Sequence, residues 1–363
     1  MKRCIWFSWK DLSHPRSGGA EVITDFHLRE LVKKNYKVYL MTSSYDNAKK
    51  KEFYNGYTII RHNRFYSCQL FYFWWILLLF KFKKNDYVVE EINTIPFLIF
   101  LIKKDRLKIF YHQLTEKIWF YETIFPISMF GFIFEKIILK IISLKKIKII
   151  VPSKSTKKNI AKYSIHNSLI KVVENLVFFK NKFNKIHYYN NFKNKKIITF
   201  IGEIRRMKRI GDLIEIYLSI KKIYPESKLH IVGKSNTKYA KRMILKNPDI
   251  SFTGFIEQNK KNDLLKKSSF LVSCSLKEGW GLTITEANQY GTPALVYNVD
   301  GLRDSVTNNK NGIIVEDNNK KQFIKKLQFY LDAKNTKEYM SLRESTYSHF
   351  INSMKNQKIK NIF

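Results

Sequence analysis

The sequence alternates short strand-like runs with longer helix-like stretches over most of its length. In the first half, runs rich in β-branched and aromatic residues occur at 4–9, 37–43, 57–62, 86–91, 107–112 and 148–153. Helix-like stretches separate most of these runs. Because parallel strands need long crossover connections, the alternation predicts a parallel sheet with helices on both faces.

The segment 180–196 interrupts this alternation, since it is dense in Asn and Lys and has no apolar period. We interpret it as a linker or surface excursion. Strand-like runs resume at 197–202, 228–233, 250–255, 269–274 and 292–298. Between the first two, the spacing of an amphipathic helix is present at Ile210, Leu213, Ile214, Tyr217 and Leu218.

The two series predict an α/β fold with two Rossmann-like, doubly wound parallel-sheet domains. We place the first domain at 1–185 and the second at 186–345, followed by a basic helical tail at 346–363. A chain of 363 residues with 45% hydrophobic residues is long and apolar enough for two cores of this kind.

The formal net charge of +36 favours an anionic partner, which could be nucleic acid, a membrane surface or a phosphate-bearing substrate. Lys, Ile, Asn, Phe and Tyr are abundant together, and A/T-rich codons encode all five, so genome composition is an alternative source of part of the charge. Cys4, Cys68 and Cys274 lie far apart and fit no disulfide ladder or zinc spacing. Cysteine usage therefore predicts a reducing, cytoplasmic compartment.

The longest apolar run is Leu70–Phe80, and the N-terminus shows no signal-peptide pattern. A spanning helix needs about 20 apolar residues, so this run is too short to cross a membrane. Lys81, Lys83 and Lys84 follow it. It could be a buried helix with basic caps, or a helix lying in a membrane interface with its lysines over anionic headgroups.

The segment 278–293, "EGWGLTITEANQYGTP", contains two carboxylates, Glu278 and Glu286, separated by seven residues. It follows a predicted strand, and a helix is expected to begin near Leu282. Ligands of parallel sheets bind beyond the carboxyl ends of strands. Gly279 and Gly281 let the backbone approach a ligand, and free N–H groups suit a diphosphate. Because a carboxylate accepts several hydroxyl hydrogen bonds, the pattern favours a nucleotide sugar; an ordinary loop is the alternative.

Two features of the first half could face the same ligand. The segment "RSGGAE" joins a strand to a helix through Gly18 and Gly19, which suits a phosphate or acceptor site, or a tight packing turn. His112 directly follows a predicted strand, where it is well placed for function, although a single histidine is more often structural.

The segment "EGWGLTITEANQYGTPALVYNVDGLRDSV" resembles the signature of the retaining glycosyltransferases of family 4, which have the two-domain GT-B fold. Four further segments resemble that family in its own order: "FSWKDLSHPRSGGAEVITDFHLRELVKKNYKVYLMTS", "YHQLTEKIWFYE", "VPSKSTKKNI" and "ITFIGEIRRMKRIGDLIEIY". The resemblance extends to about residue 330. It implies two Rossmann-like domains that face a central cleft, the first on the acceptor side and the second binding the nucleotide sugar.

The resemblance also implies roles for individual residues. Glu286 would bind the donor ribose, Glu278 the hydroxyls of the donor sugar, and Lys208 the diphosphate leaving group. His112 would reach toward the transferred sugar. The remaining donor contacts would come from Gly18, Gly19, Arg205, Arg206, Ile256, Gly279, Trp280, Gly281 and Leu282, with His112, Lys208 and Glu278 as the catalytic set.

Two positions depart from the family pattern. Glu203 stands where an arginine is usual, so either Arg205 or Arg206 substitutes for it or the phosphate clamp is weaker. Leu176 follows Asn175 where the family commonly has glycine, so the local turn must differ. An inactive member that still binds sugar nucleotides is therefore an alternative.

The implied reaction is transfer of a hexose from a UDP- or GDP-linked donor to a glycan or lipid-linked glycan, with retention at the anomeric carbon. The sequence contains no Asp-x-Asp and no metal-ligand spacing, so no metal and no cofactor are expected. Charge and the apolar run favour a peripheral position on the inner face of the plasma membrane. The alternatives are a basic nucleic-acid-binding protein, for which no recognisable module is visible, and a phosphorylase, for which no pyridoxal-phosphate lysine signal is visible.

Overall fold

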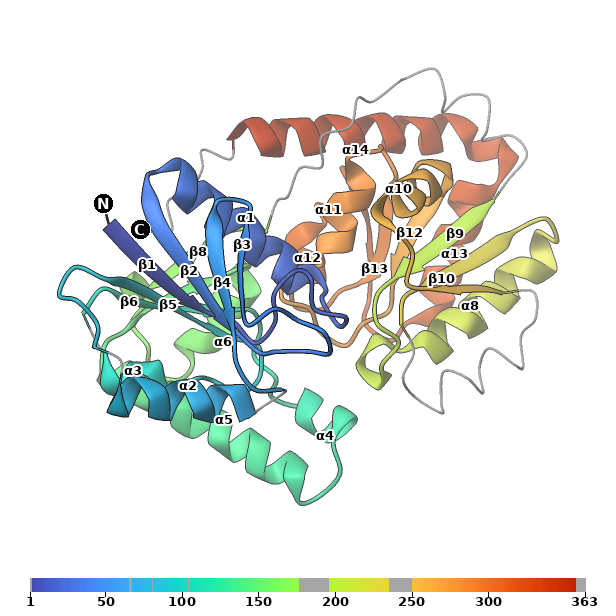
Figure 1. Cartoon of the computed structure of the whole chain (residues 1–363). Helices are drawn as coiled ribbons and strands as arrows, with labels where there is room; N and C mark the ends of the chain where they lie inside the picture. Colours follow the sequence, from blue (N-terminus) through green and yellow to red (C-terminus); the bar gives the residue numbers. More distant parts are fainter. Residues whose placement is uncertain are drawn as a thin grey trace. The chain divides into compact units, whose positions relative to one another are not determined.

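The computed structural model describes residues 2–64, 67–79, 81–103, 105–175, 196–234 and 250–356. These residues form two compact units. Unit 1 comprises 2–119 and 125–175, and unit 2 comprises 120–124 and 196–356. Each unit has its own sheet (Figure 1). The predicted boundary near residue 185, and the predicted linker apart from Lys196, lie outside the described residues.

Unit 1 contains an eight-stranded sheet of order β3-β4-β2-β1-β5-β6-β7-β8. Its strands are β1 (Lys2–Phe7), β2 (Tyr36–Thr42), β3 (Lys51–Tyr54), β4 (Tyr57–Arg61), β5 (Tyr87–Ile92), β6 (Leu107–Tyr111), β7 (Lys148–Val151) and β8 (Ile170–Val172). All pairs are parallel except β3 with β4. The six predicted strands are confirmed, whereas β3 and β8 were not predicted. The sequence did contain a hairpin signal for β3, the Asn-Gly pair at 55–56. In the structure, Asn55 and Gly56 form the turn before β4 and both have positive φ.

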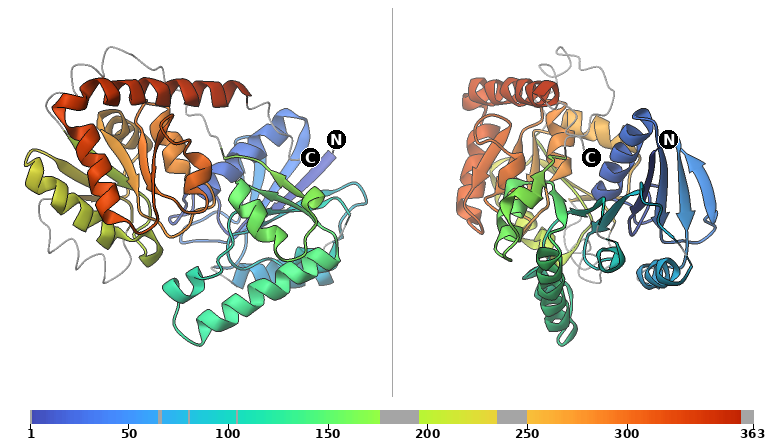
Figure 2. Two further views of the ribbon diagram at one scale, coloured as in Figure 1. Left: turned by 180° about the vertical axis from the view of Figure 1, so that it is seen from behind. Right: turned by 90° about the vertical axis from the view of Figure 1, so that its left-hand side faces the viewer.

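Helices cover both faces of this sheet (Figures 1 and 2). They are α1 (Gly19–Lys33), α2 (Ser67–Leu78), α3 (Ile99–Ile102), α5 (Ile127–Leu144) and α6 (Lys154–Ala161), and the short α4 (Ile118–Glu122) crosses from unit 1 into unit 2. α1 lies on one face, and α2 and α5 lie on the other. Tyr72 and Ile76 of α2 and Leu139 of α5 share one core with the sheet.

The apolar run that begins at Leu70 forms most of α2, but the interpretation of it as a buried helix holds for only one side. Cys68, Tyr72 and Ile76 are buried, whereas Leu70 and Trp74 are exposed. A short helix on a sheet can bury only the stripe that faces the sheet, so the opposite apolar side remains in contact with solvent.

Unit 2 contains a six-stranded parallel sheet of order β11-β10-β9-β12-β13-β14. Its strands are β9 (Ile197–Ile201), β10 (Lys228–Val232), β11 (Ser251–Gly254), β12 (Phe270–Ser273), β13 (Ala294–Tyr297) and β14 (Gly312–Val315). Its helices are α8 (Ile210–Ile223), α10 (Gln258–Lys267), α11 (Leu282–Asn288), α12 (Leu302–Ser305), α13 (Lys320–Leu331) and α14 (Thr336–Asn356). The five predicted strands are confirmed, and β14 is additional. The predicted start of the tail, residue 346, falls inside α14.

The predicted buried stripe of α8 is right at four of its five positions. Leu218 is exposed, whereas Ile216 and Ile220 are buried. The helix therefore turns a slightly different face to the sheet than the simple spacing rule selects, because sheet contacts decide which residues are covered.

The strand orders place one topological switch point in each unit. In unit 1 the order reverses between β1 and β5, and in unit 2 it reverses between β9 and β12. Loops that leave neighbouring strands at such a point run in opposite directions and leave a crevice beyond the strand ends. The predicted site residues of unit 2 follow β9 and β12, except Ile256, which follows β11.

A buried histidine of α1 makes unit 1 sensitive to acid. The His27 ring stacks on Trp6 with a centroid distance of 6.2 Å and lies 5.6 Å from the ring of Phe110. Burial lowers the pKa of His27 to about 3. Folding therefore keeps this imidazole neutral, whereas the unfolded chain takes up a proton below about pH 6.5.

We expect His27→Phe to reduce the acid sensitivity of stability. Since the folded pKa lies below the unfolded one, stability is fully present above about pH 6.5 and is lost as the pH falls toward 3, at about 1.4 kcal/mol per pH unit. Between pH 7.5 and 5.0, the wild type should lose about 2 kcal/mol more of its free energy of unfolding than the variant does. Urea unfolding at both pH values measures this, and equal losses would contradict it.

Candidate functional site

The loop after β12 is shaped by glycine at the start of α11. It runs from Cys274 to Gly281, which has φ of +87° and precedes the first residue of the helix, Leu282. A Cβ atom on Gly281 would lie 3.0 Å from Ile284 and 3.2 Å from Leu302. Both the backbone conformation and the crowding therefore favour glycine here.

Glu278 lies in this loop and is paired with Lys208. The Lys208 ammonium donates to Glu278 Oε1, and the Ser275 hydroxyl donates to the same oxygen at 2.8 Å. The Glu278 N–H donates to the Asp300 carbonyl at 2.9 Å. A Cβ on Gly301 would lie 2.1 Å from the Glu278 carbonyl oxygen, so this close approach needs glycine. The Glu278 backbone is thus fixed to the loop after β13.

The loop after β9 reaches the loop after β12 through several further contacts. Lys208 ends a short 3₁₀ turn, Arg206–Lys208, and the Met207 carbonyl accepts a hydrogen bond from the Leu276 N–H at 2.8 Å. The Arg209 guanidinium donates to the Cys274 and Ser275 carbonyls at 2.6 and 3.1 Å. These bonds join the two loops directly at the switch point of unit 2.

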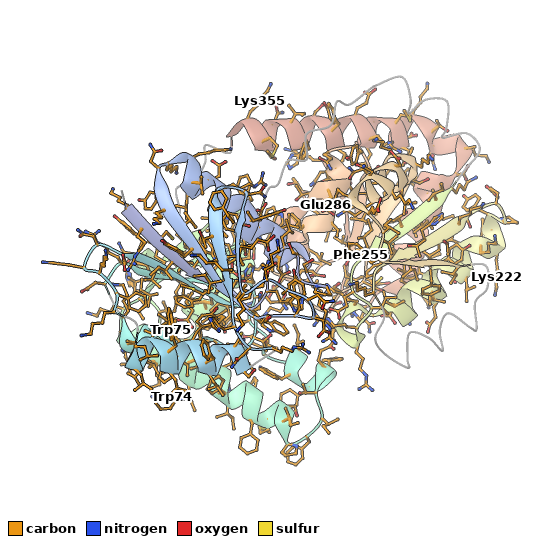
Figure 3. The ribbon with its side chains drawn as sticks, viewed as in Figure 1. Trp74, Trp75, Lys222, Phe255, Glu286 and Lys355 are labelled. Atoms are coloured by element: carbon orange, nitrogen blue, oxygen red, sulfur yellow. The ribbon has the colours of Figure 1, made fainter. Side chains whose placement is uncertain are left out.

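Glu286 lies five residues into α11, as predicted, and its carboxylate is buried (Figure 3). Lys261 of α10 donates to Glu286 Oε1 at 2.8 Å. In the same segment, the Trp280 indole donates to the Thr285 hydroxyl at 3.1 Å. Each of the two acids therefore has a lysine partner from a different element. Sequence reasoning missed Lys261, because one lysine among so many carries no signal of its own.

The other predicted residues of unit 2 lie on the same loops. Gly279 and Leu282 are partly buried, and Ile256 follows β11 and is half-buried. Arg206 is exposed, whereas the Arg205 Nε lies 3.6 Å from a Glu203 carboxylate oxygen. The acid at 203 is therefore partly neutralised by its own neighbour.

In unit 1, Gly18 and Gly19 are exposed at the start of α1. The Gly18 N–H donates to Glu21 Oε2 at 2.6 Å, and the Lys10 ammonium lies 3.2 Å from the other oxygen of that carboxylate. The Lys10 ammonium also donates to the Arg16 carbonyl at 2.7 Å. The N–H group of the N-cap residue of α1 is thus bonded to the protein's own carboxylate.

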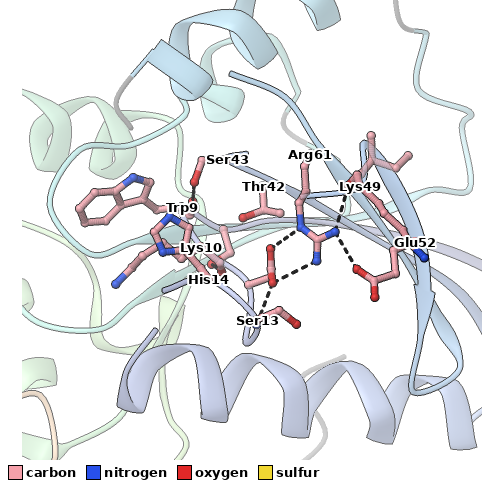
Figure 4. Close-up of polar contacts among 12 residues, drawn as sticks. Trp9, Lys10, Ser13, His14, Thr42, Ser43, Lys49, Glu52 and Arg61 are labelled. Atoms are coloured by element: carbon pink, nitrogen blue, oxygen red, sulfur yellow. Dashed lines mark hydrogen bonds and ion pairs between the residues drawn. The ribbon is translucent and has the colours of Figure 1, made fainter. Parts of the chain in front are cut away.

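A buried ion pair holds the loop that leads to these glycines (Figure 4). The Arg61 guanidinium donates to both oxygens of Asp11 at 2.8 and 3.2 Å, and the two side chains are fully buried. Arg61 also donates to Glu52 at 2.7 Å and to the Lys49 carbonyl at 3.0 Å. Asp11 accepts the Ser13 N–H at 2.8 Å, which closes the loop after β1.

His112 directly follows β6, as predicted, and its side chain is buried. The backbone N–H of His112 donates to the Ile92 carbonyl at 3.1 Å, which continues the pairing of β6 with β5. Asn175 is buried as well, and Leu176 lies outside the described residues. Within the described ranges, no group of three or more His, Cys, Asp or Glu side chains is arranged to hold a metal ion.

Comparisons with known proteins cover nearly the whole chain. A family model described as Glycosyltransferase Family 4 matches residues 17–177, and one described as Glycosyl transferases group 1 matches 181–348. An uncharacterised glycosyltransferase from Haemophilus influenzae is 26% identical over 186 residues, which is 50% of each chain. A trehalose synthase from Thermococcus litoralis is 27% identical over 172 residues, 43% of this chain and 41% of the relative. The matched segments thus span half or less of these curated relatives.

Among solved structures, Anabaena Alr3699/HepE in complex with UDP and glucose has a TM-score of 0.73. It is 12% identical in sequence, and the match covers 99% of this chain and 98% of the other. At this identity the likeness establishes the fold, and it agrees with the two parallel sheets described above.

We expect Arg61→Met to destabilise unit 1 strongly. Removing one partner of a buried ion pair leaves an uncompensated charge and costs about 3–5 kcal/mol. The matched control is Arg64→Met, because Arg64 pairs with Asp46 at 2.6 Å but both side chains are exposed, and such pairs contribute about 1 kcal/mol or less. Urea unfolding measures both variants, and a similar small effect in the two would contradict the anchoring role of Arg61.

Proposed function

The chain belongs to glycosyltransferase family 4 and has the GT-B fold, and from this premise we propose that it moves a hexose from a nucleotide-sugar donor to a glycan or lipid-linked glycan acceptor. The donor is UDP- or GDP-linked, and the anomeric configuration is retained. The domains have the roles that the family implies, with the acceptor side at 1–185 and the donor side at 186–345.

The observation that carries the proposal is the ion pair between Lys208 and Glu278 at the switch point of unit 2. An ammonium and a carboxylate side by side match a ligand that has an anionic part next to several hydroxyls. Lys208 has three N–H donors, so it can contact a diphosphate and still hold Glu278. The free carboxylate positions of Glu278 accept sugar hydroxyls, and Glu286 accepts those of the ribose.

In the proposed reaction, the bond between the anomeric carbon and the β-phosphate oxygen breaks as the acceptor oxygen attacks the same face of the sugar. The acceptor proton passes to the departing phosphate, and a nucleoside diphosphate is released. Negative charge grows on the leaving group, and Lys208, Arg205, Arg206 and the N–H groups of 279–282 stabilise it. His112, Gly18 and Gly19 contribute contacts from unit 1, and Ile256 binds the base through its main chain. The chemistry as proposed requires no cofactor and no metal.

The acceptor side of the proposal rests on the outer surface of unit 1. In the described part of the chain, no helix combines the length and apolar character needed to cross a bilayer. However, α2 and α5 lie on one face of the sheet and both carry exposed apolar side chains (Figures 1 and 3). These side chains are Leu70, Trp74, Leu77 and Leu78 on α2, and Ile127, Met129, Phe130, Ile133, Phe134, Ile137 and Leu144 on α5.

Exposed apolar surface on this scale is unusual for a soluble monomer and favours a docking role. Exposed lysines accompany it, with Lys81, Lys83 and Lys84 after α2 and Lys136 and Lys140 on α5. Aromatic side chains combined with lysines suit the interface of an anionic membrane. The proposed acceptor is therefore lipid-linked, and the enzyme is cytoplasmic and peripheral on the inner face of the plasma membrane.

We expect Glu286→Ala to weaken donor binding by roughly 10-fold or more, and Glu278→Gln to lower kcat more than it raises the donor KM. The matched control is Glu344→Ala, which removes an exposed acid from α14 of the same unit. Binding is followed by thermal shift across a panel of UDP- and GDP-sugars, and transfer by release of nucleoside diphosphate. Normal turnover in both Glu286→Ala and Glu278→Gln would contradict the assignment of these two acids to the donor site.

The same panel distinguishes the alternatives. An inactive sugar-nucleotide-binding protein would be stabilised by a donor but would release no nucleoside diphosphate with any acceptor, including a lipid-linked one. A nucleic-acid-binding protein would be stabilised by an oligonucleotide at physiological salt and by no sugar nucleotide.

The membrane contact is tested by the double variant Trp74→Ser/Phe130→Ser. Burying a large apolar side chain contributes about 1.5–3 kcal/mol, so the variant should bind vesicles containing anionic lipid at least about 10-fold more weakly. Phe329→Ser, in which an exposed phenylalanine of unit 2 is changed, serves as control and should bind like the wild type. Equal sedimentation of all three proteins with vesicles would contradict the docking surface.

A further inference from the structure

A buried carboxylate lies next to His112 in unit 1. Glu91 is near the carboxyl end of β5, beside the switch point between β1 and β5, and its side chain is almost fully buried. One of its oxygens, Oε1, accepts a hydrogen bond from the Trp6 indole N–H at 2.8 Å. The Thr24 hydroxyl of α1 contacts the same oxygen. Two neighbouring elements therefore fix the orientation of this carboxylate.

The other oxygen of Glu91 faces His112. Glu91 Oε2 lies 3.8 Å from His112 Nε2, and both buried atoms lack a hydrogen-bond partner among the described residues. The separation exceeds that of a hydrogen bond, but hydrogen bonds between functional groups often tighten when a substrate binds. Two unpartnered polar atoms buried next to each other are each other's natural partners, since an unsatisfied buried group is costly.

The groups around Glu91 keep it ionised, so the contact joins a carboxylate anion to the His112 imidazole, which can donate an N–H hydrogen bond. Burial alone would raise the pKa of Glu91, but attraction to His112 and hydrogen bonds from neighbours such as Thr24 outweigh it and hold this pKa below its usual value. Glu91 is therefore ionised at neutral pH.

We propose that Glu91 is a positioning residue for His112. Glu91 fixes the imidazole with its proton on Nε2, which leaves Nδ1 as an acceptor for a sugar hydroxyl. A carboxylate can only accept, so the nitrogen that faces it must carry the proton. The second ring nitrogen is then unprotonated in the neutral ring. This inference rests on the proposed function for its consequence, but the arrangement itself does not depend on any ligand.

The decisive variant is Glu91→Gln. The Trp6 N–H selects the amide oxygen for the position that Oε1 occupies, so the amide NH₂ takes the position of Oε2 and faces His112. Nε2 must then accept, and the proton moves to Nδ1. The substitution thus preserves size and the Trp6 hydrogen bond while it reverses the tautomer of His112.

The experiment records ¹⁵N spectra of the histidine rings at about pH 9, where an ordinary imidazole is neutral, without donor or acceptor. The His112 signals are assigned by their loss in His112→Asn. We expect the Nε2–H tautomer in the wild type and the Nδ1–H tautomer in Glu91→Gln. With substrates, kcat of the Gln variant should fall about 10- to 100-fold and the donor KM should change less than about twofold.

Thr24→Val is the matched control, because it removes a polar neighbour of Oε1 but leaves the charge that faces His112. It should keep the Nε2–H tautomer. A proton on Nδ1 of His112 in the wild type would overturn the proposal. The same His112 tautomer in the wild type and in Glu91→Gln would also overturn it. The wild-type spectrum shows which nitrogen carries the proton even if Glu91→Gln does not fold. If the tautomers behave as expected but no sugar is transferred, the proposed function fails and the positioning role of Glu91 stands. If Glu91→Gln transfers sugar normally, the proposed function stands and the positioning role of Glu91 fails.

Discussion

In unit 2, the ion pair between Lys208 and Glu278 joins the loops that leave β9 and β12. These strands are neighbours, but their connections diverge, so a bond beyond the strand ends is needed to hold the loops together. Hydrogen bonds of the Met207 carbonyl and the Arg209 guanidinium support the same junction. At this junction the Lys208 ammonium and the Glu278 carboxylate neutralise each other.

The switch point of unit 1 has two acids, Asp11 in the loop after β1 and Glu91 near the carboxyl end of β5. Asp11 is matched by the guanidinium of Arg61, whereas one oxygen of Glu91 is left facing a histidine. Asp11, whose two oxygens both accept from Arg61, stabilises the loop after β1. Glu91, which has one oxygen facing His112, controls in our proposal which nitrogen of that ring carries the proton.

The sequence predicted most strands and the place of both acids, because these signals are local. Glu278, Glu286 and their glycines lie within one segment, so their spacing alone placed them in a loop and the following helix. Partners were not predictable in the same way. Lys261 is 25 residues from Glu286, and Glu91 is 85 residues from Trp6, so only the fold brings each pair together. The edge strand β3 was missed although Asn55 and Gly56 marked its turn, and Leu218 was misplaced because the sheet, not helical spacing, decides burial.

The distribution of acids between core and surface increases the excess of positive charge at the surface. Among the described residues, eight acidic side chains are buried but only three of Lys or Arg, although the sequence contains 66 basic and 30 acidic residues. Burial therefore removes a much larger fraction of the negative charges from the surface than of the positive ones. Whatever the codon composition contributes, folding increases the cationic character of the outside. Such a surface attracts anions at long range before any specific contact forms.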